Sequence, residues 1–263
     1  MAVRVIVTRP QQEAADWVAR LQARGLRAQA LPLIDIGPAP EPAAMVEAWR
    51  QLGSCQAVMF VSRPAVAAFL AARPPGLPGW PGAQAGCGLR AWAPGPGTAQ
   101  ALLDGGVPAA CIDAPAADAA QADSEALWQL VAAQAQPGAV ALIVRGGDAS
   151  GRAAGRAWLA ERLQASGATV REVVAYVRRV PVFGAAQRAL ASTAAGDGST
   201  WLFASSQSLA ALRSNLPGQS WGRARALATH PRIAAAVRGF GFGSVHESAP
   251  GFEAVVASIE SLQ

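Results

Sequence analysis

The chain has 263 residues, a formal net charge of +5 at pH 7 and 52% hydrophobic residues, a length that suits two α/β units, each with its own core. All 22 basic residues are arginine, which excludes P-loop and Schiff-base chemistry because both need lysine. The arginines are scattered singly and charged residues make up only 15% of the chain, so the sequence does not indicate a nucleic-acid-binding surface.

Short runs rich in β-branched residues alternate along the chain with Ala-rich amphipathic stretches, the pattern of parallel strands joined by crossover helices. No run of apolar residues is long enough to span a membrane. The runs predict strands at 3–8, 28–34, 57–62, 89–93, 110–113, 140–145, 169–177, 200–204, 225–229 and 244–247. Ten strands would form two five-stranded sheets.

Three segments recur in the same order and at nearly constant spacing, which indicates a tandem duplication. Each recurring piece is a strand, a polar turn and the start of a helix. The pairs are 5–9 with 142–146, 60–62 with 203–205, and 95–99 with 230–234.

The turns that follow the predicted strands are small, hydroxylic or cationic. Ligands bind at the carboxyl ends of parallel strands, where helix N-termini present unpaired N–H groups and a positive dipole end. Serine and threonine at these places also cap helices, so each single turn is open to both interpretations. Taken jointly, the turns predict a carboxylate-binding site formed by Arg9, Ser62, Gly97, Thr98, Arg145, Gly146, Gly147, Ser205, Ser206 and Gln207.

In their order and spacing, these motifs resemble the uroporphyrinogen-III synthase family over nearly the whole chain. The more specific matches are 95–99, 123–127, 144–146 with 155–156, 176–178 and 203–206. Two places depart from the family pattern. Pro64 stands where the family usually has Asn, and His230 to Ile233 replaces a Gly-x-x-Thr motif.

The resemblance implies two similar flavodoxin-like α/β domains, each a five-stranded parallel sheet flanked by helices, joined by two extended crossing segments at 31–38 and 170–179. Residues 1–35 plus 175–263 would form one discontinuous domain and residues 36–174 an inserted second domain, with the substrate cleft between them. A plain tandem duplication would instead divide the chain near Pro137.

The resemblance also implies a lyase of heme biosynthesis that cyclises hydroxymethylbilane, a linear tetrapyrrole, to uroporphyrinogen III with inversion of ring D and loss of water. It implies no cofactor and no metal, and His230 and His246 lack ligand partners at helical spacing. We expect a cytoplasmic monomer with no nucleic-acid or membrane partner. The alternative is a non-catalytic two-domain protein that binds or senses a small anion.

Tyr176 is the single tyrosine of the chain and lies where the family carries a functionally implicated tyrosine. A phenol is protonated at neutral pH and can donate a hydrogen bond to the departing hydroxyl of the bilane. The alternative is an ordinary interface aromatic. Arg63 and Arg156 could add charge complementarity to the substrate, whereas Arg178 and Arg179 are predicted to be solvated surface.

Overall fold

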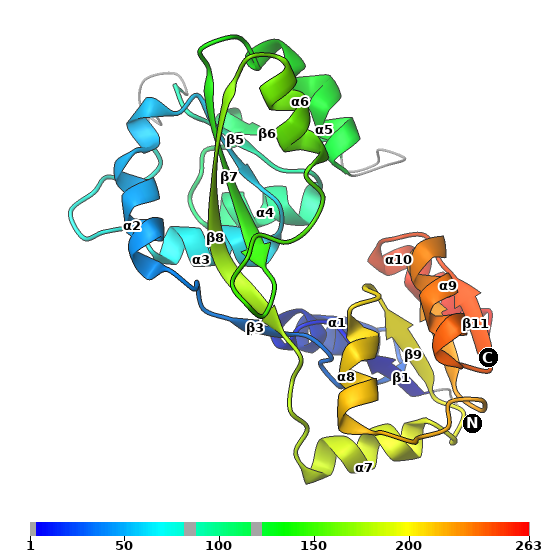
Figure 1. Cartoon of the computed structure of the whole chain (residues 1–263). Helices are drawn as coiled ribbons and strands as arrows, with labels where there is room; N and C mark the ends of the chain where they lie inside the picture. Colours follow the sequence, from blue (N-terminus) through cyan, green and yellow to red (C-terminus); the bar gives the residue numbers. More distant parts are fainter. Residues whose placement is uncertain (1–3, 82–87, 117–122, 263) are drawn as a thin grey trace. The chain divides into compact units, whose positions relative to one another are not determined.

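The computed structural model of the chain describes residues 4–81, 88–116 and 123–262. By their internal contacts the residues form two compact units (Figure 1), Met1–Asp35 with Arg179–Gln263, and Ile36–Arg178. By this division the inserted unit ends at Arg178, and the boundary implied by the resemblance follows Val174. Among the described residues, none of the helices is both long and apolar enough to cross a lipid bilayer.

The first unit contains a five-stranded sheet in the order β11-β10-β9-β1-β2, and all neighbouring strands are parallel. Its elements are β1 (Arg4–Val7), α1 (Gln11–Ala23), β2 (Arg27–Ala30), α7 (Ala185–Ala194), β9 (Thr200–Phe203), α8 (Ser208–Asn215), β10 (Arg225–Ala228), α9 (Pro231–Phe240), β11 (Ser244–Glu247) and α10 (Phe252–Glu260).

Helices cover both faces of this sheet because successive side chains of a strand point to opposite faces. Val5 and Val7 pack with α1 and α10 on one face. Ile6 packs on the other face with residues of α7, α8 and α9. All four strand residues of β9 are buried, as expected for a parallel sheet with two covered faces.

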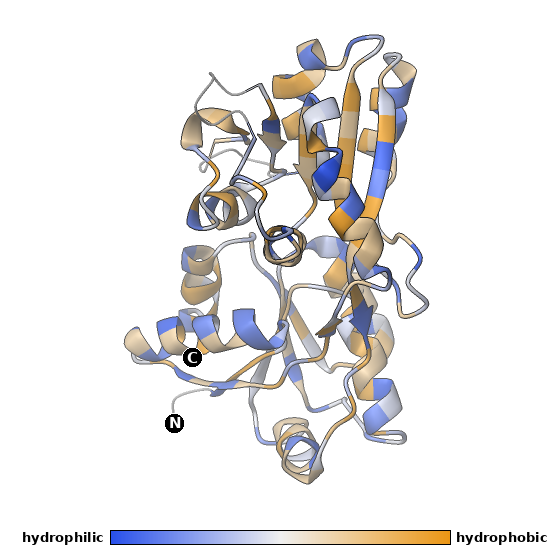
Figure 2. Ribbon diagram, turned by 90° about the vertical axis from the view of Figure 1, so that its left-hand side faces the viewer, coloured by the Kyte–Doolittle hydropathy of each residue, from blue (hydrophilic) through white to orange (hydrophobic). Residues whose placement is uncertain are grey.

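The second unit contains a six-stranded sheet in the order β3-β8-β7-β4-β5-β6. Its elements are β3 (Asp35–Gly37), α2 (Pro42–Arg50), β4 (Ala57–Phe60), α3 (Arg63–Ala71), β5 (Arg90–Trp92), α4 (Pro96–Asp104), β6 (Ile112–Asp113), α5 (Ser124–Val131), β7 (Val140–Gly147), α6 (Trp158–Ala165) and β8 (Thr169–Arg179). One face packs against α2, α3 and α4, and the other packs against α5 and α6. Several strands carry mainly hydrophobic residues, which are drawn orange in Figure 2.

Each of the ten predicted strands is present; the strand at 244–247 has the predicted ends, and each of the others differs at one end or both. The second sheet has one strand more than expected, because β3 from the first crossing segment pairs with β8 from the second. The strand β6 is short because Ala109–Cys111 forms a 3-10 turn before it. The strand β8 continues to Arg179, two residues beyond its predicted end.

Candidate functional site

The carboxyl ends of β4, β5 and β7 lie at one edge of the second sheet, because these strands are parallel. Ser62 follows β4 and caps α3, its Oγ accepting a hydrogen bond from the N–H of Ala65 at 3.4 Å. Gly95 follows β5 and is the first residue before α4. Arg145 and the two glycines after it form the end of β7. The edge therefore collects three of the predicted turns within one unit.

A β-bulge places Tyr176 at this edge. The pairing of β7 with β8 runs in register from Val140 to Arg145, which faces Val174, and then shifts so that Gly146 faces Tyr176. The extra residue, Ala175, lets Tyr176 join the same core as Val173, on the α3 side of the sheet. Bulges commonly redirect a side chain in this way.

The hydroxyl of Tyr176 has two polar partners. It lies 3.1 Å from the Oγ of Ser62 and accepts a hydrogen bond from Nη2 of Arg178 at 2.9 Å. Tyr176 is only 1% exposed, and the guanidinium carbon of Arg178 lies 5.6 Å from its ring centroid. The prediction that Arg178 is solvated surface was wrong, because its side chain folds back over the tyrosine.

Gly146 and Gly147 are buried and packed against β8 and the following loop. A Cβ on Gly146 would lie 2.5 Å from Cζ of Tyr176, and one on Gly147 would lie 2.8 Å from Val174. Both positions have room only for glycine. The structure thus brings Gly146 to the tyrosine ring.

Arg145 is held by partners within its own unit. Its side chain is 7% exposed and forms an ion pair with Glu172 at 2.9 Å, and its Nη2 donates to the carbonyls of Ala154 and Arg156 at 3.2 Å. The Nε of Arg145 is buried without a hydrogen-bond partner. Arg145 therefore fixes the loop that carries Arg156.

A pocket of about 200 Å³ opens beside these residues. Its walls include Arg145, Arg156, Arg178 and Ser124, together with apolar atoms from Met59 and Leu159. Arg156 is also paired with Glu125. Three guanidinium groups beside apolar walls suit a ligand that carries both carboxylates and a flat hydrophobic ring.

The turn after β5 contributes Gly97 and Thr98. Gly97 is exposed, and a Cβ there would lie 3.5 Å from Cδ of Arg63. Thr98 is 7% exposed and lies inside α4. Gly97 is thus accessible to solvent, whereas the side chain of Thr98 is mostly covered.

In the first unit, the end of β1 provides Thr8 and Arg9. Thr8 is buried and donates its hydroxyl to the carbonyl of Leu202 at 2.6 Å. Arg9 forms an ion pair with Glu13 at 3.1 Å and lies 4.2 Å from the ring centroid of Trp17. The carboxylate of the helix that follows orients this guanidinium.

The turn after β9 provides Ser205, Ser206 and Gln207. The Oγ of Ser205 accepts a hydrogen bond from the N–H of Gln207 at 3.2 Å, and Ser206 and Gln207 are exposed. This turn and that after β1 lie at one edge, because β1 and β9 are parallel. The first unit therefore presents its own small group of predicted residues.

Each of the two histidines forms a hydrogen bond with a residue two positions away in the sequence. Nδ1 of His230 accepts a hydrogen bond from the N–H of Arg232 at 3.0 Å and caps α9, and Nε2 of His246 lies 2.9 Å from Oγ of Ser244. Within the described ranges, no group of three or more His, Cys, Asp or Glu side chains could hold a metal ion.

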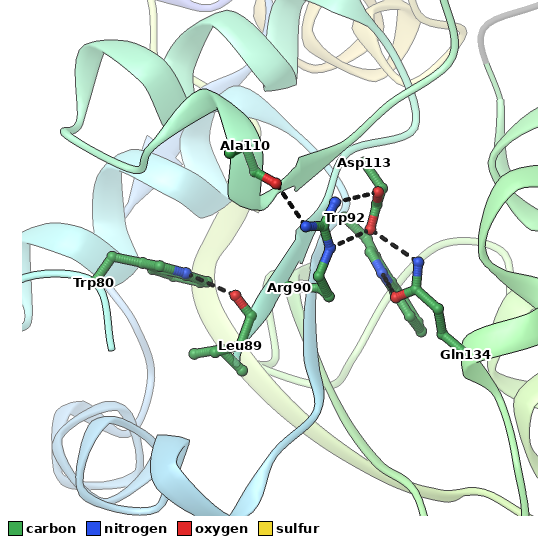
Figure 3. A network of polar contacts seen from close by, with 7 residues as sticks. All are labelled: Trp80, Leu89, Arg90, Trp92, Ala110, Asp113 and Gln134. Atoms are coloured by element: carbon green, nitrogen blue, oxygen red, sulfur yellow. Dashed lines mark hydrogen bonds and ion pairs between the residues drawn. The ribbon is translucent and has the colours of Figure 1, made fainter. Parts of the chain in front are cut away.

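A second polar network, which the sequence did not suggest, fastens the last strand of the second sheet (Figure 3). Arg90 on β5 binds both carboxylate oxygens of Asp113 on β6. Gln134 donates to Asp113 at 3.1 Å and accepts from the indole N–H of Trp92 at 3.1 Å. The hydrogen bond with Asp113 raises the pKa of Arg90 above its ordinary value, and the network ties β5 and β6 to the segment that carries Gln134.

Comparison with known proteins identifies the family. A family model described as "Uroporphyrinogen-III synthase HemD" matches residues 15–257. The chain belongs to the uroporphyrinogen-III synthase family. None of the curated proteins matches its sequence significantly.

Solved structures of uroporphyrinogen-III synthases share the fold. The enzyme from Helicobacter pylori has 15% identity and a TM-score of 0.59, with 100% of both chains covered. A mutant of the enzyme from Thermus thermophilus has 18% identity and a TM-score of 0.55, covering 100% of this chain and 99% of its own. At these identities the likeness concerns the two-domain α/β architecture.

Membership in the uroporphyrinogen-III synthase family gives the activity. The chain is a lyase that cyclises hydroxymethylbilane to uroporphyrinogen III, with inversion of ring D and loss of water. No finding favours the alternative of a non-catalytic sensor. Arg178 is the main residue of the candidate site that sequence reasoning missed, and its spacing of two from Tyr176 on a strand was the available signal.

Proposed function

We propose that Tyr176 is the acid group of this cyclisation and that the strand-end turns of each unit bind carboxylates of the bilane. The observation that carries the proposal is the placement of the Tyr176 hydroxyl between a serine hydroxyl and a guanidinium at a sheet edge. An O–H group held in this way can supply a proton for the departing hydroxyl of the substrate.

The pocket that Arg145, Arg156 and Arg178 line supports the assignment of carboxylate sites. Arg156 and Arg178 line it from two different segments, and guanidinium groups bind carboxylates with two parallel hydrogen bonds. In the first unit, the exposed residues Ser206 and Gln207 stand at a helix start, where N–H groups favour anions.

In this proposal, the orientation in which the last pyrrole is held determines which isomer forms. Loss of the hydroxyl gives a resonance-stabilised azafulvene, which needs only modest proton donation. The bound carboxylates then hold the last pyrrole so that its substituted carbon is attacked, which gives a spiro intermediate and an inverted ring. Holding reacting atoms in place can supply several kcal/mol of the barrier reduction.

A coupled assay tests the proposal. The purified chain is mixed with freshly generated hydroxymethylbilane, the products are oxidised, and the ratio of uroporphyrin I to III is read by chromatography. We expect the wild type to give isomer III and Tyr176→Phe to lose about 100-fold in rate. Full activity of Tyr176→Phe would rule out the acid role, and spontaneous isomer I alone would contradict the function.

We also propose that the enzyme works as a cytoplasmic monomer. Light scattering after size-exclusion chromatography should give one species near the 26.8 kDa of the chain. A stable dimer at assay concentrations would contradict the monomeric state.

A further inference from the structure

We infer that Ser62 and Tyr176 form a relay of two protons that move together, in which Ser62 touches the departing hydroxyl and Tyr176 supplies the second proton from behind it. Arg178 is the positioning residue that holds the phenolate formed. The inference rests on the proposed function, because it assigns the proton path of that same reaction.

The directions of the hydrogen bonds allow Tyr176 to donate its proton to Ser62. A guanidinium can only donate, so the Tyr176 oxygen accepts from Arg178 at 2.9 Å. The phenolic hydrogen is then available for Ser62, whose Oγ lies 3.1 Å away. The chain of donors therefore runs from Arg178 through Tyr176 to Ser62.

The burial of the two side chains indicates that Ser62, and not Tyr176, reaches the substrate. Tyr176 is 1% exposed and belongs to the core of the second unit, which leaves its hydroxyl little access to a bulky tetrapyrrole. Ser62 is half-buried at the sheet edge, where its Oγ accepts from the N–H of Ala65. Within the described part of the chain, Ser62 donates to no third residue, so its hydrogen can point outward once Tyr176 donates to it.

The proton balance follows from this geometry. The C–O bond of the hydroxymethyl group breaks and its electron pair goes to oxygen. That oxygen takes the Ser62 proton and leaves as water, Ser62 takes the Tyr176 proton, and Tyr176 becomes a phenolate. Bond formation at the substituted carbon gives the spiro intermediate without loss of a proton, because that carbon carries no hydrogen. After the inverted ring forms its final bond through its unsubstituted α-carbon, that carbon loses its proton, and the same path returns a proton to Tyr176.

Arg178 stabilises the charged state of this relay. The phenolate would lie 2.9 Å from Nη2 of Arg178, and a charge-assisted hydrogen bond is about twice as strong as a neutral one. Gly146 keeps the ring in place, because any side chain there would collide with Cζ. Arg179, the next residue, is exposed and offers a matched control.

A double-mutant cycle tests the relay. Ser62→Ala and Tyr176→Phe should each lower kcat by about 100-fold with little change in KM. The double variant should be no slower than the slower single variant, since both remove one path. If the single effects multiply to about 10⁴-fold, the two residues act independently and the relay is wrong.

Two serine variants separate the relay from helix capping. Ser62→Asn keeps an acceptor for the N–H of Ala65 but removes the hydroxyl, so it should be as slow as Ser62→Ala while unfolding like wild type. Ser62→Thr keeps both features and should retain at least about a third of the wild-type kcat. Full activity of Ser62→Asn would overturn the relay.

Solvent isotope effects give a readout that a structural role would not move. The rate in mixtures of H₂O and D₂O should curve with the deuterium fraction in wild type, because two protons move together, and should become linear in Tyr176→Phe. Arg178→Gln should lower kcat about 10-fold, Arg178→Lys should recover most of it, and Arg179→Gln should match wild type. A linear wild-type plot, or equal effects of Arg178→Gln and Arg179→Gln, would contradict the relay.

The relay and the proposed function fail in different ways. Formation of isomer III by wild type supports the function regardless of the variants, whereas the relay depends on the rates of the variants and on the isotope data. Isomer I alone from wild type contradicts both. Isomer III from wild type together with multiplicative single effects contradicts the relay and leaves the function standing.

Discussion

Gly146 packs directly against the ring of Tyr176, so that a Cβ on Gly146 would lie 2.5 Å from Cζ of the tyrosine. The two residues face each other across β7 and β8 just after the bulge. The ring of the proposed acid, Tyr176, therefore packs against position 146, where only glycine fits.

Gly146→Ala should displace Tyr176 and lower both stability and activity. Forcing a methyl group into a packed site costs about 1–3 kcal/mol, which urea unfolding measures, and kcat should fall together with it. Gly53→Ala is the matched control, since a Cβ there meets nothing within 4 Å. Equal stability of the two variants would mean that the ring moves aside at no cost.

Glu172→Gln should destabilise the second unit, because Arg145 is 7% exposed and would lose its counter-charge. We expect a loss of about 1–2 kcal/mol in the free energy of unfolding, reduced from a fully buried pair because Glu172 is 33% exposed. Asp148→Asn breaks the exposed pair with Arg152 and should change the free energy of unfolding much less, because solvent screens this pair. A similar cost for both variants, abolished by salt, would contradict a buried role for Arg145.

Cys55 should react slowly with iodoacetamide, because burial raises the pKa of its thiol, while the nearby Arg171 partly opposes the shift. Mass spectrometry of the Cys55 peptide between about pH 7 and pH 10 measures the rate across the ordinary range of thiol ionisation. Arg171→Gln should slow the reaction further, because it removes the charge that favours the thiolate. Faster alkylation in Arg171→Gln would show that access, not ionisation, limits the rate.

The same shift predicts how stability depends on pH. The folded pKa lies above the unfolded one, so the contribution of Cys55 is complete below about pH 8.5, the ordinary value of a thiol, and is lost as pH rises through the folded pKa. The free energy of unfolding should therefore fall more steeply above that pH in wild type than in Cys55→Ala. Parallel curves would exclude a raised pKa.

Asp113→Asn should loosen the end of the second sheet. It removes the charge that binds Arg90 through two hydrogen bonds and weakens the contact through Gln134 to Trp92. A charge-assisted pair at this partial burial contributes about 1–2 kcal/mol, measurable by unfolding and by the near-ultraviolet signal of Trp92. Asp104→Asn, at a residue that accepts a surface hydrogen bond from Gln100, should leave both unchanged.

Much of the fold could be predicted from the sequence, because the spacing of hydrophobic residues in the β-branched runs differs sharply from their spacing in the Ala-rich stretches. The strand starting at Val140 and the one starting at Thr200 were predicted with correct starts, since both are buried on two faces. The three residues of β3 carry no such pattern. Their pairing with β8 is a tertiary effect that no local period reports.

The candidate site was less accessible to prediction. Ser62 and Arg145 were both expected to bind substrate, and the structure gives Arg145 a carboxylate and two carbonyls as partners. That Arg145 also contacts the bilane stays a prediction. Arg178 was missed because its role depends on which way the side chain turns after a bulge, which sequence spacing alone does not fix.

Successive side chains of a strand point to opposite faces of the sheet, so residues at odd positions share one face and residues at even positions share the other. The extra residue before Tyr176 shifts this alternation by one position for the rest of β8. Tyr176 and Arg178 therefore point to one face of the sheet, and Val177 points to the other. Insertion or deletion of one residue in this stretch would exchange both sides at once, which makes the length of the crossing strand as constrained as the chemistry it carries.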